Sequence, residues 1–235
     1  MSNPRFILSD SDALIQLFIA KQGAILAFLK GRFGITLAVT PEVEIEISSH
    51  RKFGNQFEQV LLRFIGSGSI VVLDDETVRD VLKEQGLTGA LLDQSLSDIG
   101  DRSRTYHKHV GVGEAYTHVK ALALQVPLMT HDIRAIETLR HVGLPVATPY
   151  LRFADLLVFA RKVGGISKEE CDRARATLDG QKEWLPQQLK SRRMVDADWD
   201  QFDCRITCDT QMTENSNSLC IEPVTIDGTR GGLKV

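Results

Sequence analysis

Cysteine is scarce in this chain: there are four in 235 residues, and all lie in its last third. That number is too small for a disulfide framework in a chain of this length. Cys204, Cys208 and Cys220 offer sulfur ligands for zinc, but no CxxC pair or neighbouring histidine completes a zinc-binding set. We therefore expect ordinary thiols.

Long apolar runs and a strong excess of one charge are also absent. Residues 6–29 are rich in apolar side chains, but Asp10, Asp12 and Lys21 interrupt them, so they form neither a clean signal peptide nor a membrane span of about 20 apolar residues. The net charge of −3 excludes a uniformly basic coat for nucleic acid. With 43% hydrophobic and 25% charged residues, the chain is expected to be a globular cytoplasmic protein with no membrane partner.

Apolar runs of strand length alternate along the chain with segments of helical periodicity. Strands are expected at residues 6–8, 35–39, 69–73, 128–130 and 146–147, with helices between them that include residues 76–84, 114–125 and 133–141. Such alternation is typical of βαβ units, which build a parallel sheet covered on both faces. The predicted fold class is α/β, three layers of the α/β/α type, with a central parallel sheet of about five strands.

The expected organisation is a domain at residues 1–165, a helical extension at 166–195 and an acidic polar tail at 196–235. Ser167 and Glu170 form a capping box that starts a helix in the extension. The tail has three basic and eight acidic residues, a charge of 3 − 8 = −5, and few apolar clusters. We expect either a functionless, partly disordered tail or an arm that docks on its own domain, a second subunit or a protein partner.

Two acids follow predicted strands: Asp10 after the first and Asp132 after the fourth. Carboxyl ends of parallel strands share one edge of a sheet, so these side chains are expected to lie close together. Glu46, in the helix after the second strand, and Glu114, which opens a later helix, belong near the same edge. Converging carboxylates raise one another's pKa unless a cation neutralises them, and oxygen ligands favour Mg²⁺ or Mn²⁺.

Each acid alone also fits a helix cap or a solvated loop residue. Asp12 is expected to cap the first helix, because it stands directly before Ala13 and the apolar residues that follow. On this interpretation Asp10 is the ligand and Asp12 is not. His118, four residues after Glu114, is expected to be packed or exposed rather than catalytic.

Four phrases in order resemble the PIN-domain ribonucleases, a family that includes the VapC-type toxins of toxin-antitoxin systems. They are residues 9–15 (SDSDALI), 39–46 (VTPEVEIE), 111–115 (GVGEA) and 128–132 (LMTHD), within a resemblance that covers roughly residues 5–165. His131 departs from it, because many relatives carry a second Asp or a basic residue there. The long stretch 75–110 is a second departure, so the substrate preference does not carry over.

The resemblance implies a PIN-like, metal-dependent endoribonuclease that hydrolyses RNA, as a toxin would. Asp10, Glu46, Glu114 and Asp132 would be the catalytic residues and the ligands of Mg²⁺ or Mn²⁺, and Thr130 would support them by hydrogen bonding. RNA is the implied substrate, and an antitoxin protein and a second copy of the chain are the partners to consider.

A basic segment precedes Glu114 and is the first candidate for holding an RNA backbone. Basic side chains neutralise phosphates, and an aromatic ring such as that of Tyr106 can stack on a base. A solvated face is the competing interpretation of this segment. The candidate RNA-binding residues are Arg102, Arg104 and Lys108, together with Arg134 just past Asp132.

Two other functions remain open. Asp10 and Asp12 also resemble the acid pair of haloacid-dehalogenase-like phosphatases, in which Asp10 would be phosphorylated and Asp12 would act as general acid and base. The other alternative is a catalytically inactive PIN-like module that binds protein or nucleic acid.

Overall fold

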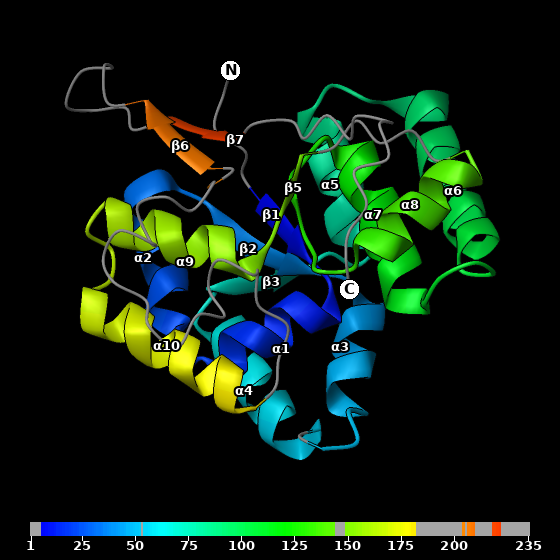
Figure 1. Cartoon of the computed structure of the whole chain (residues 1–235). Helices are drawn as coiled ribbons and strands as arrows, with labels where there is room; N and C mark the ends of the chain where they lie inside the picture. Colours follow the sequence, from blue (N-terminus) through cyan, green and yellow to red (C-terminus); the bar gives the residue numbers. More distant parts are fainter. Residues whose placement is uncertain are drawn as a thin grey trace.

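The computed structural model describes residues 6–52, 54–143, 149–181, 204, 206–209 and 218–221. Five parallel strands form the central sheet in the order β3-β2-β1-β4-β5, and ten helices surround it (Figure 1). The fold is therefore α/β with three layers, as predicted.

The strands of the sheet are β1 (Phe6–Ser9), β2 (Thr36–Val39), β3 (Ile70–Val72), β4 (Leu128–Met129) and β5 (Tyr150–Leu151). The helices are α1 (Ser11–Ile19), α2 (Gly23–Phe33), α3 (Pro41–Ser48), α4 (Gly54–Gly66), α5 (Asp75–Glu84), α6 (Gly89–Tyr106), α7 (Val112–Leu124), α8 (Ile133–His141), α9 (Phe153–Lys162) and α10 (Lys168–Gly180).

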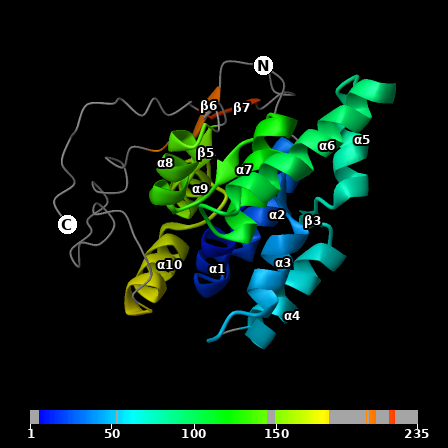
Figure 2. The ribbon, with the colours of Figure 1, turned by 90° about the vertical axis from the view of Figure 1, so that its right-hand side faces the viewer.

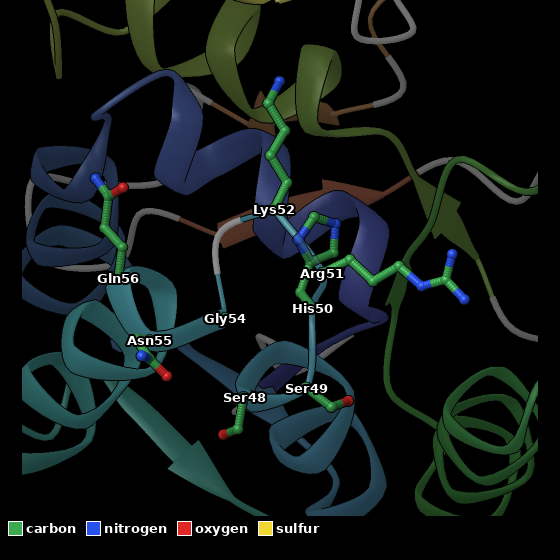
Figure 3. Close-up of a pocket in the computed structure, with 8 residues that line it drawn as sticks. All are labelled: Ser48, Ser49, His50, Arg51, Lys52, Gly54, Asn55 and Gln56. Carbon is green, nitrogen blue, oxygen red and sulfur yellow. The ribbon is translucent and has the colours of Figure 1, made fainter.

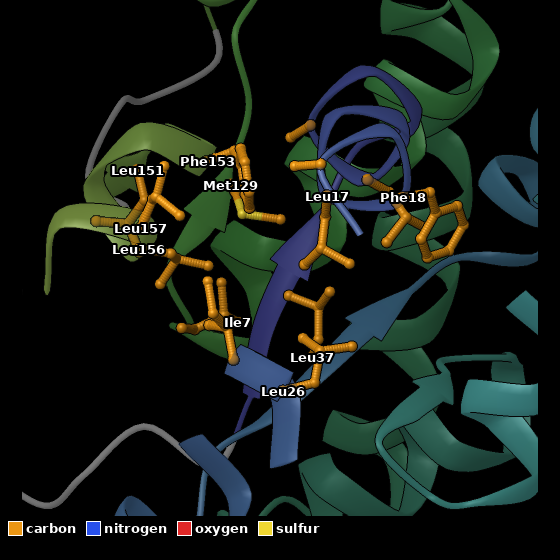
Figure 4. Close-up of a cluster of buried hydrophobic side chains, with 14 of the residues drawn as sticks. Ile7, Leu17, Phe18, Leu26, Leu37, Met129, Leu151, Phe153, Leu156 and Leu157 are labelled. Carbon is orange, nitrogen blue, oxygen red and sulfur yellow. The ribbon is translucent and has the colours of Figure 1, made fainter. Parts of the chain in front are cut away.

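Alternate residues of each strand enter two separate hydrophobic cores, one on each face of the sheet. In β1, Ile7 belongs to the core that includes side chains of α1, α2, α3, α4, α9 and α10. Phe6 and Leu8 belong to the other core, which includes side chains of α5, α6, α7 and α8. Figure 4 shows the first core, where Ile7 lies among side chains of neighbouring strands and of the helices on that face. Both faces are buried because side chains on a strand point alternately to opposite sides.

The order of the strands creates a switch point between β1 and β4. From β1 the chain adds β2 and then β3 on one side of the sheet, and later adds β4 and β5 on the other. In open parallel sheets, the crevice beyond the carboxyl ends of the two strands at such a point is the usual ligand site. Asp10 directly follows β1, and Asp132 comes three residues after β4.

Most predicted elements lie within a few residues of the observed ones. The start of α3 has the expected cap, because Thr40 accepts a hydrogen bond from the Val43 N–H and Pro41 is the first helical residue. The fifth strand of the described sheet is β5, Tyr150–Leu151, which pairs with β4. The predicted position, 146–147, lies outside the described residues.

The predicted helical extension packs against the main domain through α10. Ser167 and Glu170 form the expected capping box, with Ser167 N–H to Glu170 Oε2 at 2.7 Å. Beyond the capped end, Cys171, Ala174 and Leu178 are fully buried in the first core. This helix therefore belongs to the same packed unit as the strands, because their apolar side chains share one core. Residues 182–195 of the extension lie outside the described residues.

Two short segments of the tail are described, and one contacts the domain. β6 (Ile206–Asp209) and β7 (Ser218–Ile221) pair in antiparallel fashion. Ile206 is buried in the first core, and the thiol of Cys204 lies 3.4 Å from the Asp155 carbonyl oxygen of α9. Cys204 and Cys171 are free thiols. The rest of the tail lies outside the described residues.

No single helix in the described part of the chain is long and apolar enough to cross a membrane. Only α1 and α2 taken together meet that test, and the two helices are bent by 109° relative to each other. Figure 2, turned by 90° from Figure 1, shows both inside the bundle of helices.

Candidate active site

Asp10 occupies the first turn of α1 at the end of the central strand. Its N–H donates to the Met129 carbonyl oxygen of β4 at 3.1 Å, which fixes Asp10 beside the neighbouring strand. Its Oδ1 accepts a hydrogen bond from the Ala13 N–H at 2.8 Å, so Asp10 is the N-cap of α1. The prediction that Asp12 caps this helix is therefore wrong, because the chain turns into the helix one residue after Asp10.

The second oxygen of Asp10, Oδ2, is buried without a hydrogen-bond partner in the described part of the chain. Asp10 as a whole is 1% exposed. Burial raises the pKa of Asp10 to about 7, and hydrogen bonds from Thr130 and Ala13 only partly oppose this. The charges of Asp12 and Glu114 raise the pKa further. Buried polar atoms are normally paired, so this oxygen is a candidate ligand atom.

Asp132 lies at the end of the neighbouring strand and caps α8. Its Oδ1 accepts from the Ala135 N–H at 2.9 Å, and its own N–H donates to the Thr130 hydroxyl at 3.1 Å. Thr130 is 1% exposed, and its side chain also lowers the pKa of Asp10 by hydrogen bonding. Thr130 thus lies between the two strand-end acids and contacts both residues.

Glu46 and Glu114 meet at the first turn of α7. Glu46, half-buried on α3, accepts a hydrogen bond through Oε1 from the Gly113 N–H at 2.9 Å. Glu114 accepts one through Oε2 from the Gly111 N–H at 2.9 Å. Two carboxylates thus occupy donors that a helix N-terminus leaves open, and the helix dipole favours their negative charge. This interaction holds α3 against α7.

Gly113 is required for that contact. A Cβ atom at this position would lie 2.6 Å from Cδ of Glu46, far inside van der Waals distance. A side chain here would displace the carboxylate of Glu46 from the Gly113 N–H, so this hydrogen bond depends on glycine.

Glu114 and Asp132 interact directly across the site. Burial raises the pKa of Glu114 to about 7, and the hydrogen bond from Gly111 opposes the rise. The charge of Asp132, a side-chain hydrogen bond with Asp132 and the charge of Asp12 raise it further. Two carboxyl groups in such contact are not both ionised without cost, because like charges repel.

Asp12 is a fifth acid of the same cluster. It follows Asp10 by two residues, and burial raises its pKa, as do the charges of Asp132 and Glu46. The nearby imidazole of His50, just beyond α3, opposes this rise in the pKa of Asp12. The Asp-Ser-Asp phrase is the sequence signal for this residue, which was expected to be a helix cap.

The five acids Asp10, Asp12, Glu46, Glu114 and Asp132 are called the acidic cluster below. Four of them, all but Asp12, were expected at this edge of the sheet, whereas Asp12 was expected to be a helix cap. In the described part of the chain no three His, Cys, Asp or Glu side chains are already arranged around a metal position. The fit to a hard divalent cation therefore rests on the donor set: carboxylate oxygens only, mutual repulsion, and the buried Oδ2 of Asp10.

Two histidines near the cluster, His118 and His131, have pKa values lowered by burial. Burial lowers the pKa of His118 on α7 to about 4, although the charge of Asp132 opposes this, and Nε2 of His118 has no hydrogen-bond partner within the described ranges. Burial also lowers the pKa of His131 to about 4; Arg152 lowers it and Asp155 raises it. His131 therefore lies near the Arg152–Asp155 ion pair, where Arg152 Nη2 is 2.9 Å from Asp155 Oδ1.

The predicted RNA-binding residues are exposed. Arg102 and Arg104 lie in the last turns of α6, and Lys108 lies in the connection to α7. Arg104 pairs with Asp101 at 2.6 Å on the same helix. Arg134, in the first turn of α8, is two residues from Asp132. The basic residue that affects the pKa of Asp12 is instead His50, which the sequence did not single out.

Comparisons with known proteins give no family: no protein-family model matches the chain, and no curated protein matches its sequence.

Proposed function

We propose that this chain is a metal-dependent endoribonuclease of the PIN-like type, which hydrolyses RNA phosphodiester bonds with Mg²⁺ or Mn²⁺. The observation that carries the proposal is the placement of Asp10 and Asp132 at the two strands that flank the switch point. Such a crevice is where an open parallel sheet receives its ligand. A role as a toxin with an antitoxin partner, and a cytoplasmic location, belong to the same proposal.

Charge balance supports a cation at this position. Asp10 and Glu114 have pKa values raised to about 7 by burial and by neighbouring acids. At neutral pH the cluster therefore takes up protons, or its charge is balanced by a cation. A bound Mg²⁺ or Mn²⁺ would lower the pKa of a water molecule and stabilise negative charge on phosphate oxygens.

Each acid has a distinct task in this proposal. Asp10, Glu114, Asp132 and Glu46 would hold the ion, and Asp12 would add negative charge at the rim beside His50. Thr130 and Gly113 are positioning residues: Thr130 hydrogen-bonds at the two strand ends, and Gly113 donates to Glu46.

The test is cleavage of a labelled single-stranded RNA by the purified full chain with Mn²⁺. Asp10→Asn and Asp132→Asn are expected to reduce the rate by at least about 100-fold, because each removes a negatively charged ligand. Both variants should fold, since an Asn side chain can also accept the capping hydrogen bond at a helix N-terminus. Circular dichroism checks the fold of each variant.

Other outcomes identify the alternatives. Cleavage that survives in both variants contradicts the assignment of the site. Turnover of a small phosphoester with phosphate trapped on Asp10 would indicate the dehalogenase-like phosphatase. Tight RNA binding without turnover by the wild-type chain would indicate an inactive binding module.

A further inference from the structure

A pocket lies at the turn between α3 and α4. Its volume is about 470 Å³. Figure 3 shows the residues that line it. The volume falls within the ordinary range for small-ligand sites. Its described lining is basic or neutral, with no acidic side chain: Ser48, Ser49, His50, Arg51, Lys52, Gly54, Asn55 and Gln56.

The turn that forms the pocket is held at several points. The Gly54 N–H donates to the His50 carbonyl oxygen at 2.7 Å, and a Cβ at Gly54 would lie 2.5 Å from the Ser48 carbonyl oxygen. The His50 ring lies 6.2 Å from that of the buried Phe57 on α4, centroid to centroid. Lys52 Nζ donates to Gln181 Oε1 at 3.0 Å, just beyond α10. The backbone of the turn is therefore held in place, and Arg51 and Lys52 extend from it.

The pocket adjoins the acidic cluster. The Ser49 hydroxyl donates to the Glu46 carbonyl oxygen at 3.2 Å, so the pocket begins within one turn of a cluster residue. His50 and Arg51 follow this serine directly, at the end of α3 that carries Glu46. Figures 1 and 2 show α3 and α4 beside α1, and α3 also contacts α7. A polynucleotide crossing the cluster past Glu46 would meet this turn next.

Arg51 is the side chain best suited to bind a phosphate group there. It is exposed and has no ion-pair partner among the residues that the structure describes. In Figure 3 it extends away from the turn in a different direction from Lys52, whose ammonium group is held by Gln181. The guanidinium fork matches two phosphate oxygens at once, and a phosphate is repelled by the five acids unless a cation faces it.

We propose that the α3–α4 turn binds a backbone phosphate of the RNA next to the scissile bond, with Arg51 as the main contact and His50 and Lys52 at its sides. This inference rests on the proposed ribonuclease function. It places the RNA strand on the side of the acidic cluster where the α3–α4 turn lies. Arg51 is here a substrate-binding residue and does not take part in the chemical step.

The test compares Arg51→Gln with Arg63→Gln, a control on α4 that makes the same charge change at an exposed site in the helix's last turn. Binding of a fluorescein-labelled mixed-sequence 12-nucleotide RNA to the full chain is followed by anisotropy in EDTA over a range of salt. Arg51→Gln should weaken binding about tenfold, as expected for loss of a charged hydrogen-bonded contact. The slope of log affinity against log salt should become shallower by about 0.7. Arg63→Gln should stay within about twofold of wild type.

Kinetics with Mn²⁺ separate binding from chemistry. Arg51→Gln should raise KM with kcat almost unchanged, and Arg51→Lys should recover part of the affinity, since it restores the charge without the fork. Equal affinities and salt slopes for Arg51→Gln, Arg63→Gln and wild type would overturn the phosphate site while leaving the ribonuclease function intact, provided that wild type cleaves. A wild-type chain that neither binds nor cleaves the RNA would overturn both proposals.

Discussion

At the scale of single residues, the site depends on which atoms already have partners. Oδ1 of Asp10 is occupied by the Ala13 N–H, whereas Oδ2 is buried without a partner within the described ranges. Glu46 is held by the Gly113 N–H at the start of α7. Glu46 is thus anchored by the backbone of α7, and Asp10 keeps one oxygen that can still accept a ligand. An anchored carboxylate beside a buried oxygen without a partner suits a site whose ligands are held in place around a cation.

Replacing Gly113 by Ala tests the contact with Glu46. The new methyl group would displace the Glu46 carboxylate from the Gly113 N–H, so we expect lower RNA cleavage and a loss of about 1 kcal/mol in unfolding free energy from the broken hydrogen bond. Urea denaturation measures the stability. Gly31→Ala is the control, because a Cβ there meets nothing within 4 Å, and in a helix it should gain up to about 1 kcal/mol. A harmless Gly113→Ala would show that Glu46 does not occupy this place.

At the scale of elements, α10 is part of the domain rather than an appendage. The sequence predicted its capping box correctly, since the box involves only neighbouring residues. Local sequence does not reveal which partner an amphipathic helix selects. α10 contacts α1 and α9, and its buried side chains complete the core on that face of the sheet.

Leu178→Ala measures how much α10 contributes. Leu178 is fully buried near the end of the helix, so its truncation should cost about 2–5 kcal/mol in unfolding free energy. Leu62→Ala removes the same atoms from a side chain that is 46% exposed on α4 and should cost no more than about 1 kcal/mol. Guanidinium denaturation of both variants decides the point. Similar small losses would mean that α10 is not packed into the core.

At the scale of the whole molecule, one sheet brings together acids from four distant parts of the chain. Asp10 and Asp12 come from the first crossover, Glu46 from α3, Glu114 from α7 and Asp132 from the end of β4. Bringing them together concentrates negative charge in a partly buried region. Folding and cation binding are therefore expected to be thermodynamically linked.

That linkage predicts how stability depends on pH. The pKa values of Asp10 and Glu114 rise to about 7 in the folded chain from ordinary values of 3.8 and 4.5. Because the folded state holds these protons more tightly, their stabilising contribution is complete below about pH 4 and is lost as pH rises through about 7. Without divalent cations, Tm should be several degrees lower at about pH 8 than at about pH 5.5.

Two comparisons test this interpretation by differential scanning calorimetry. Asp10→Asn should show a smaller difference in Tm between the two pH values, since it removes one of the two titrating groups. Mn²⁺ should raise the Tm of wild type at about pH 8 and have less effect on Asp10→Asn; a cation at 100 times its Kd would add about 2.7 kcal/mol. An unchanged wild-type Tm on addition of millimolar Mn²⁺ would contradict cation binding by the cluster.

The sequence by itself determined the alternation of strands and helices, the caps at Thr40 and Ser167, and the strand-end positions of Asp10 and Asp132. These features depend on periodicity and on residues a few positions apart, so they are readable without a fold. The parallel arrangement also followed, because helices of crossover length separate the strands.

Only the tertiary structure decided which groups meet. The capping role of Asp10 rather than Asp12 depends on where the backbone turns, and the place of β5 depends on pairing with β4. Three further features join residues that are at least 46 − 12 = 34 positions apart in sequence: the entry of Asp12 into the acidic cluster, the contact between Glu46 and Gly113, and the approach of His50 to Asp12. Such contacts arise from packing and burial, which local sequence patterns do not encode.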